Sequence, residues 1–145
     1  MELIKEWGGF KIYNDTTATN PSAAIEGIKA LGPDIILICG GMNKGMDFQK
    51  MGEAIDKSVD AVYFLNGDVV DEITCSMKDQ SVIEGTFDNL ETLLTKLKKD
   101  IEANPYFKKG GSILFSPGAT SFNMFQNEFD RGRKFNKAVE KIFKG

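Results

Sequence analysis

The chain has 145 residues, of which 41% are hydrophobic and 27% are charged, and its net charge is −3. This length fits one domain that buries roughly 70% of its unfolded surface, and the small acidic charge argues against a nucleic-acid partner, which needs a basic face. The sequence contains no histidine and has two cysteines outside any CxxC pair, which argues against a zinc site or a Cys–His nucleophile.

The chain begins with a predicted hairpin and a helix. The hairpin is indicated by Gly8-Gly9, a pair that favours a two-residue turn between two apolar segments. The helix is indicated by Asn20-Pro21, which offers an N-cap followed by proline at the first helical position, and it is expected to end at Gly32-Pro33. The expected strands are Leu3–Trp7 and Phe10–Tyr13.

The middle of the chain alternates short apolar runs with helical segments. Unbroken apolar runs bounded by turn residues indicate strands that are covered on both faces of a sheet. Amphipathic spacing between the runs indicates helices. In chain order we expect a strand at Ile35–Cys39, a helix near Asp47–Lys57, a strand at Ala61–Leu65, a short helix at Val69–Ser76, a short strand at Ser81–Glu84 and a helix from Leu90 to Ile101 that ends before Pro105.

The C-terminal segment is predicted to form a strand, a polar loop and a last helix. The strand, Ser112–Phe115, ends in a loop that contains a proline, a glycine and two hydroxyl side chains. The last helix is expected over about Asn123–Lys144, with an apolar stripe that faces the core. That stripe contains Phe125, Phe129, Gly132, Phe135, Val139 and Ile142.

The alternation of strands and helices predicts an α/β fold. Strands that are joined through helices run parallel, and the helices cover both faces of the sheet. We therefore expect a three-layer, Rossmann-like domain with a mostly parallel sheet of about six strands, to which the N-terminal hairpin adds one antiparallel strand. Because no linker interrupts the pattern, residues 1–145 are expected to form one domain.

Polar residues are concentrated in the segments that follow the strands. The carboxyl ends of parallel strands meet at one edge of a sheet, where ligands usually bind. The segments NDTTATN (14–20), GGMNKGMD (40–47), NGD (66–68) and SPGATS (116–121) are therefore expected to share that edge. The second segment matches neither the GxGxxG fingerprint nor the P-loop, so it does not indicate a dinucleotide site or a Walker-type phosphate site.

Lys44, Ser121 and the hydroxyls of the NDTTATN segment (14–20) are the candidate ligand-binding side chains of this edge. Taken singly, each has an ordinary explanation, because hydroxyls often cap helices and loop lysines are usually solvated. Together, a cation and two hydroxyl donors near helix N-termini indicate a site for a carboxylate or a phosphate. The sequence offers no nucleophile paired with a base and no cluster of metal ligands, so we expect the domain to hold a ligand without performing chemistry.

Three segments resemble one known family. NDTTATNP, GGMNKGMDF and SPGATSFNMFQNEFDRGRKF are similar to the C-terminal domain of the Mur ligases, and most of all to the members that add D-glutamate. The resemblance covers about residues 2–143. It implies an ATP-dependent ligase that adds D-glutamate to UDP-N-acetylmuramoyl-L-alanine in peptidoglycan precursor synthesis. Such an enzyme has a UDP-binding N-terminal domain, a central ATPase domain and this amino-acid-binding domain.

The resemblance also implies which residues hold D-glutamate. Thr19, Lys44, Ser121 and Phe122 match those positions. For the first three this agrees with the chemistry of the side chains, since the lysine supplies charge for a carboxylate and the hydroxyls supply donors. Phe122 is expected to contribute its backbone at the start of the last helix. Neither a catalytic residue nor a metal ligand is expected in this domain.

Asp15 and Thr17 are the expected ATP-binding positions. Asp15 matches an acidic residue that meets the ATP ribose or its surroundings, and Thr17 stands where many family members have a lysine near the phosphates. The resemblance assigns Arg131 and Gly132 to packing of the last helix. The acid and the aromatic of the last motif stand in reverse order here, so Phe129 is expected to stay in the core.

Cofactors and partners follow from the family. ATP and Mg²⁺ are expected to act in the complete enzyme and not to bind this domain alone, whose isolated form is expected to be inactive. The expected partners are D-glutamate and, through other domains, UDP-N-acetylmuramoyl-L-alanine and ATP, with no nucleic acid and no membrane. The expected location is the bacterial cytoplasm.

Two alternatives stay open at this point. The chain is expected to be a domain excised from a longer protein, but a standalone, non-catalytic module with the same fold would instead bind a small anion or a protein partner. It could also be the C-terminal domain of a related ligase such as folylpolyglutamate synthase, against which the NDTTATN segment argues.

Overall fold

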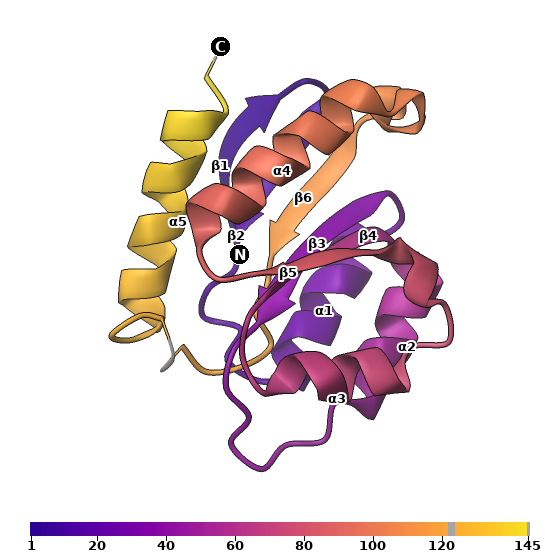
Figure 1. The fold of residues 1–145 in the computed structure, drawn as a ribbon, viewed down its shortest axis with the longest axis vertical. Helices are drawn as coiled ribbons and strands as arrows, with labels where there is room; N and C mark the ends of the chain where they lie inside the picture. Colours follow the sequence, from indigo (N-terminus) through magenta and orange to yellow (C-terminus); the bar gives the residue numbers. More distant parts are fainter. Residues whose placement is uncertain (122–123, 145) are drawn as a thin grey trace.

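The computed structural model describes residues 1–121 and 124–144, and Figure 1 shows its ribbon. Strands and helices alternate along the chain as the sequence predicts. In chain order the elements are β1 (Glu2–Trp7), β2 (Phe10–Asn14), α1 (Pro21–Leu31), β3 (Ile35–Gly40), α2 (Gln49–Ser58), β4 (Val59–Leu65), α3 (Val69–Ser76), the 3₁₀ turn η1 (Gln80–Val82), β5 (Ile83–Phe87), α4 (Leu90–Ala103), the 3₁₀ segment η2 (Pro105–Lys109), β6 (Gly111–Phe115) and α5 (Glu128–Ile142).

The strands form one six-stranded sheet in the order β1-β2-β6-β3-β4-β5. β1 runs antiparallel to β2, and every other neighbouring pair is parallel. β6, the last strand in the sequence, lies between β2 and β3, so that Ile113 is opposite Ile12 on one side and Ile36 on the other. The predicted fold class, a mostly parallel sheet with one antiparallel N-terminal strand, is confirmed.

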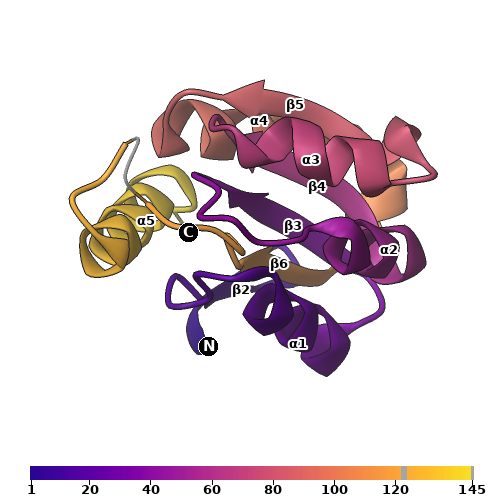
Figure 2. The same cartoon turned by 90° about the horizontal axis from the view of Figure 1, so that it is seen from below.

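Helices cover both faces of the sheet (Figures 1 and 2). α1, α2 and α3 pack on one face, over the buried side chains of Leu37 and Phe64. α4 and α5 pack on the other face, over Tyr63 and Phe115, and the ring of Phe115 stacks on that of Phe135 in α5 with 4.3 Å between centroids. Because successive strand residues point to opposite faces, the unbroken apolar runs of β3 and β4 supply both cores.

Both turn signals near the N-terminus are confirmed. Gly8 and Gly9 have φ angles of +59° and +85°, the left-handed conformation that a tight hairpin turn needs at both positions. The side chain of Asn20 accepts a 2.9 Å hydrogen bond from the backbone N–H of Ala23, and α1 starts at Pro21. These short-range contacts fix the entry of the chain into the sheet.

The strand predicted at Ser81–Glu84 is displaced in the structure. Asp79 accepts hydrogen bonds from both the N–H and the hydroxyl of Ser81, which holds residues 80–82 in a 3₁₀ turn. β5 therefore begins at Ile83 and runs to Phe87 beside β4. Local side-chain bonding of this kind competes with strand pairing.

The last helix also begins later than predicted, and one core assignment was wrong. Asn127 caps α5 by accepting a hydrogen bond from the N–H of Asp130, so the helix begins at Glu128. In this register Arg131 occupies the inner face, whereas Phe129 is 59% exposed and is not part of the core. Phe135 is buried as predicted.

Within the described residues, none of the helices combines the length and the apolar character that crossing a membrane requires.

Candidate functional site

Four loops follow the carboxyl ends of parallel strands at one edge of the sheet. The chain leaves β3 toward α2 on one face, and it leaves the neighbouring β6 toward α5 on the other face (Figure 2). Neighbouring strands whose connections diverge to opposite faces mark the point of an α/β sheet at which ligands usually bind. The candidate site is placed at this point, where the loops after β3 and β6 meet.

Backbone hydrogen bonds join three of these loops. Met42 donates its N–H to the carbonyl of Thr120 at 3.0 Å, and Thr120 returns the bond at 3.3 Å, which makes a short antiparallel bridge. The hydroxyl of Thr120 also donates to the Met42 carbonyl. On the other side, Gly118 N–H donates to the carbonyl of Ala18 at 2.8 Å. The predicted convergence of these loops is therefore confirmed for the backbone.

Gly41 makes this close approach sterically feasible. Its φ is +141°, and a Cβ at this position would lie 2.3 Å from the carbonyl oxygen of Thr120. The carbonyl of Gly41 in turn accepts a 3.3 Å hydrogen bond from Val69 N–H. The same carbonyl oxygen lies so close to Gly67 that a Cβ added to Gly67 would be 2.2 Å from it. The fourth loop, 66–68, is thereby packed against the second.

Arg131 ties the first and last of these loops to α5. Its side chain is 1% exposed. Its guanidinium donates to the Thr16 carbonyl at 2.7 Å, to the Thr16 hydroxyl at 3.1 Å and to the Ala119 carbonyl at 3.0 Å. Burial away from water lowers the pKa of Arg131 to about 10, so the group stays charged at neutral pH. The bonds are therefore charge-assisted, which makes them stronger than bonds between neutral groups.

Asn14, at the end of β2, adds a second tie to the same helix. Its Oδ1 accepts from Thr16 N–H, and its amide nitrogen donates to the Gly132 carbonyl at 3.0 Å and to Asn136 Oδ1 at 2.8 Å. The hydroxyl of Thr16 donates to the carbonyl of Glu128. The hydroxyl of Thr16, like that of Thr120, is thus bonded to the scaffold.

The predicted D-glutamate residues lie on the joined loops. Thr19 is half-buried, Lys44 is exposed, and Ser121 is 3% exposed at the start of the loop that leads to α5. Phe122 lies outside the described residues. The structure thus brings together the loops that carry three of the four residues, and the ligand contacts of their side chains stay predictions.

The predicted ATP-binding residues lie on the first loop in different surroundings. Asp15 is 9% exposed, and its Oδ2 accepts a 2.9 Å hydrogen bond from Ser116 Oγ, while its Oδ1 lies 3.4 Å from the amino terminus of Met1. Thr17 is exposed.

Among the residues that the structure describes, no group of three or more cysteine and carboxylate side chains is arranged to hold a metal ion.

Sequence reasoning missed the residues that support the site. Asn14, Thr16 and Ser116 were not singled out, and Arg131 was assigned only to packing. Apart from the local bond between Asn14 and Thr16 and the bond from Arg131 to Ala119, their partners lie more than 100 positions away. No periodicity or local spacing in one sequence encodes contacts of that length, so no signal was available to find them.

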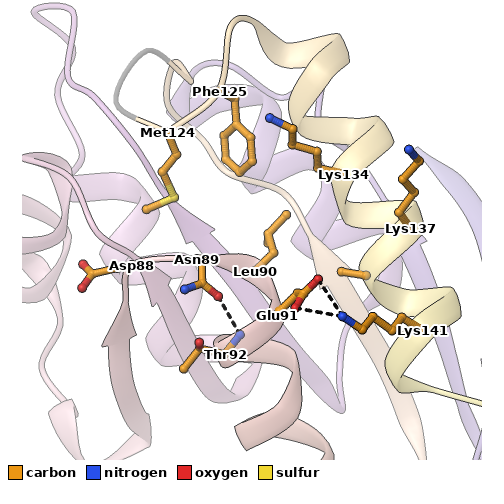
Figure 3. Close-up of a pocket in the computed structure, with 11 residues that line it drawn as sticks. Asp88, Asn89, Leu90, Glu91, Thr92, Met124, Phe125, Lys134, Lys137 and Lys141 are labelled. Carbon is orange, nitrogen blue, oxygen red and sulfur yellow. Dashed lines mark hydrogen bonds and ion pairs between the residues drawn. The ribbon is translucent and has the colours of Figure 1, made fainter.

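A separate hollow lies between the start of α4 and the side of α5 that carries Lys134, Lys137 and Lys141 (Figure 3). Its volume is about 740 Å³, within the range of small-molecule sites. Leu90 and Phe125 give it apolar walls, while Lys134 pairs with Asp130 at 3.1 Å and Lys141 pairs with Glu91 at 3.2 Å. Lys134, Lys137 and Lys141 of α5 thus line the hollow together with apolar side chains.

Comparisons with known proteins agree on the kind of domain. Residues 1–114 match the family described as "Mur ligase, glutamate ligase domain". The UDP-N-acetylmuramoylalanine–D-glutamate ligase of Treponema pallidum is 37% identical over 99% of this chain and 26% of its own length, and that of a Roseiflexus species is 36% identical over 97% and 29%. The crystal structure of MurF ligase from Thermotoga maritima in complex with ADP shares the fold, with a TM-score of 0.53 and 19% identity over 94% of this chain and 30% of that one. The chain thus spans less than a third of the length of these relatives.

Proposed function

The chain belongs to the Mur ligase family, as its glutamate ligase domain, and we propose that it is the amino-acid-binding domain of an ATP-dependent ligase that adds D-glutamate to UDP-N-acetylmuramoyl-L-alanine. The names of the curated relatives support the substrate. The observation that carries the proposal is the backbone bridge between Met42 and Thr120, which joins two of the loops that carry the expected binding residues. On this proposal the protein works in the bacterial cytoplasm, as part of a longer chain whose other domains bind the UDP moiety and ATP.

Each proposed contact follows from the chemistry of the side chain. The ammonium of Lys44 pairs with a carboxylate of D-glutamate, because a charge-assisted hydrogen bond to an anion is the strongest contact that a lysine offers. The hydroxyls of Thr19 and Ser121 donate to the same or the other carboxylate. Phe122 completes the set on the strength of the family resemblance. Held in this way, the amine of D-glutamate is oriented toward the reacting carboxyl group, and positioning of this kind accounts for a large part of catalysis in many enzymes.

Asp15 and Thr17 are proposed to contact the nucleotide when this edge of the sheet faces the ATP-binding part of the complete ligase. Both stand on the first loop, whose backbone is bonded to α5 through Arg131. The described residues offer no grouped acidic ligands for Mg²⁺, so the metal ion and the acyl-activating chemistry of ATP are assigned to the other domains. We expect the chain by itself to show no ATPase or ligase activity.

An NMR titration of the labelled chain with D-glutamate tests the proposal. We expect shifts at the amides of Thr19, Lys44 and Ser121, with an affinity in the millimolar range or weaker because other domains complete the site. Lys44→Gln should abolish these shifts, whereas Lys50→Gln, which removes an exposed lysine of α2, should preserve them. Shifts of equal size in wild type and Lys44→Gln would refute the assigned site.

A second candidate function is a standalone module that binds a small anion in the hollow between α4 and α5. Three lysines of α5, Lys134, Lys137 and Lys141, line this hollow with Leu90 and Phe125, and cations beside apolar walls suit an anion that carries an apolar group (Figure 3). Titration with phenyl phosphate separates the two candidates. Shifts at Leu90, Phe125 and Ala138, with an affinity well above that for D-glutamate, would favour the second.

A further inference from the structure

Thr120 is joined to Met42, in the loop after β3, by its backbone and by its side chain. Its carbonyl accepts a hydrogen bond from Met42 N–H at 3.0 Å, and its own N–H returns a longer bond of 3.3 Å to the Met42 carbonyl. Its hydroxyl donates to that same carbonyl at 3.1 Å. The hydroxyl of this half-buried residue therefore reinforces the longer of the two backbone bonds.

This pair stands beside both of the residues that are proposed to contact the ligand from these two loops. Lys44 follows Met42 by two positions, and Ser121 follows Thr120 directly. The carbonyl of Ser121 accepts a 3.1 Å hydrogen bond from Phe125 N–H. Ser121 is therefore a buried residue whose backbone is held on both sides.

The loop that carries Lys44 is held from another direction as well. Asn43, the residue before Lys44, donates from its backbone N–H to Asp68 Oδ1 and from its side-chain amide to Glu72 Oε2, both at 2.6 Å. These bonds attach the loop to the start of α3. Because each loop has its own anchor, the bonds between the two loops set the separation of Lys44 and Ser121.

A fixed separation has a consequence for a ligand with two carboxylates. The carboxylates of D-glutamate are separated by one methylene group more than those of D-aspartate. A site whose contacts cannot shift distinguishes two such ligands, whereas a site whose contacts can shift accommodates both with similar affinity. Selection by length therefore depends on the bonds between the loops as well as on the side chains that contact the ligand.

We propose that Thr120 is a positioning residue whose hydroxyl, through its bond to Met42, sets the spacing between Lys44 and Ser121 and thereby the preference of the site for D-glutamate over D-aspartate. This inference rests on the proposed function, because it takes Lys44 and Ser121 as ligand-binding residues. When the hydroxyl is removed, the Met42 carbonyl keeps the N–H of Thr120 as a donor. The effect therefore falls on the spacing of the loops more than on the stability of the fold.

NMR titrations of the full chain with D-glutamate and with D-aspartate test the role of this hydroxyl. We expect the wild type to bind D-glutamate about tenfold more tightly than D-aspartate. Thr120→Val keeps the branched shape and replaces only the hydroxyl by a methyl group. In this variant D-glutamate should bind about two- to fivefold more weakly, within the range of one hydrogen bond between neutral groups. The affinity for D-aspartate should change less, so the preference should fall.

Two further variants complete the test. Thr120→Ser keeps a hydroxyl and should retain the wild-type preference. Thr95→Val in α4 is the matched control, because it also removes a hydroxyl bond to a carbonyl, that of Glu91 at 2.7 Å. It should bind both acids as the wild type does. Urea denaturation of each variant measures any loss of stability, which would lower both affinities together.

The outcomes separate this inference from the function on which it rests. If Lys44→Gln abolishes D-glutamate binding but Thr120→Val keeps the wild-type preference, the role of Thr120 is refuted and the proposed site stands. A wild type without a preference, or an equal weakening of both acids in Thr120→Val, would also refute it, because the spacing would then not distinguish the two ligands. If Lys44→Gln binds D-glutamate as the wild type does, the site assignment fails and this inference fails with it.

Discussion

The carbonyl oxygen of Thr16 accepts a 2.7 Å hydrogen bond from the guanidinium of Arg131, 115 positions further along the chain. The same guanidinium reaches Ala119, so one buried charge connects two loops of the candidate site. Burying a charge costs free energy unless its hydrogen bonds are satisfied. The guanidinium of Arg131 donates its hydrogen bonds to oxygens of those two loops. The arrangement of the loops therefore depends on this side chain.

Arg131→Lys is expected to destabilise the fold. A lysine keeps the charge, but its donors radiate from one nitrogen and cannot reproduce the planar fork of a guanidinium. At least one of the buried carbonyls should therefore lose its partner, at a cost of about 1–3 kcal/mol in the free energy of unfolding. Urea denaturation measures this, with Arg133→Lys, at a side chain that is 67% exposed, as the control. Equal stability of the two variants would show that the buried bonds contribute little.

Gly132→Ala is expected to bring α5 into a steric clash with the first loop. The added Cβ would lie 2.6 Å from Cγ2 of Thr16, and overpacking of this kind costs about 1–3 kcal/mol. Adding Thr16→Ser removes that methyl group and keeps the hydroxyl that bonds to Glu128. The double variant should recover the loss and gain up to about 1 kcal/mol, because alanine favours a helix more than glycine does. Thermal or urea denaturation of the three proteins checks the order, and a double variant no more stable than Gly132→Ala would contradict it.

Gly41→Ala is expected to separate the second loop from the last one. Its Cβ would press against the Thr120 carbonyl at 2.3 Å, so the Met42–Thr120 bridge would have to open. We expect D-glutamate binding to fall below detection. Gly8→Ala is the matched control: it also places alanine at a positive φ, but it lies in the hairpin turn with no atom within 4 Å of the new Cβ. It should cost about 1 kcal/mol of stability and leave binding unchanged; loss of binding in both variants would point to general destabilisation.

Tyr63 is expected to make the protein less stable in alkali. Its side chain is fully buried, and its hydroxyl donates to Asp100 Oδ2 at 2.6 Å; burial first, and then the carboxylate, raise the pKa of Tyr63. Above the ordinary tyrosine pKa of about 10, the folded protein therefore keeps a proton that the unfolded chain has lost. The free energy of unfolding should then fall by about 1.4 kcal/mol per pH unit from this group.

Tyr63→Phe supplies the control for this pH dependence. It removes the titrating group, so its stability should fall less steeply between pH 10 and 11 in urea denaturation. Cys39, whose pKa is raised by burial, contributes equally in both proteins and does not affect the comparison. Parallel slopes for wild type and Tyr63→Phe would show that Tyr63 ionises in the folded state.

The elements that the sequence predicted best are those with short-range causes. The Gly8-Gly9 turn and the cap at Asn20 depend on residues at most three positions apart, and both are present. The start of α5 was predicted five residues too early, because the apolar spacing before it resembled a helix while the cap at Asn127 set the true beginning. Phe129 was placed in the core for the same reason, and it is exposed.

The sequence by itself determined the fold class, the family and the four loops of the candidate site, since each of these depends on patterns of neighbouring residues. Only the tertiary structure decided how the loops are held. They are held by the Met42–Thr120 bridge, by the hydrogen bond from Arg131 to the Thr16 carbonyl and by the hydrogen bond from the side-chain amide of Asn43 to Glu72. Each of these contacts joins residues between 29 and 115 positions apart. Such pairs meet only after the parallel sheet has brought the carboxyl ends of its strands together, so local sequence carries no record of them.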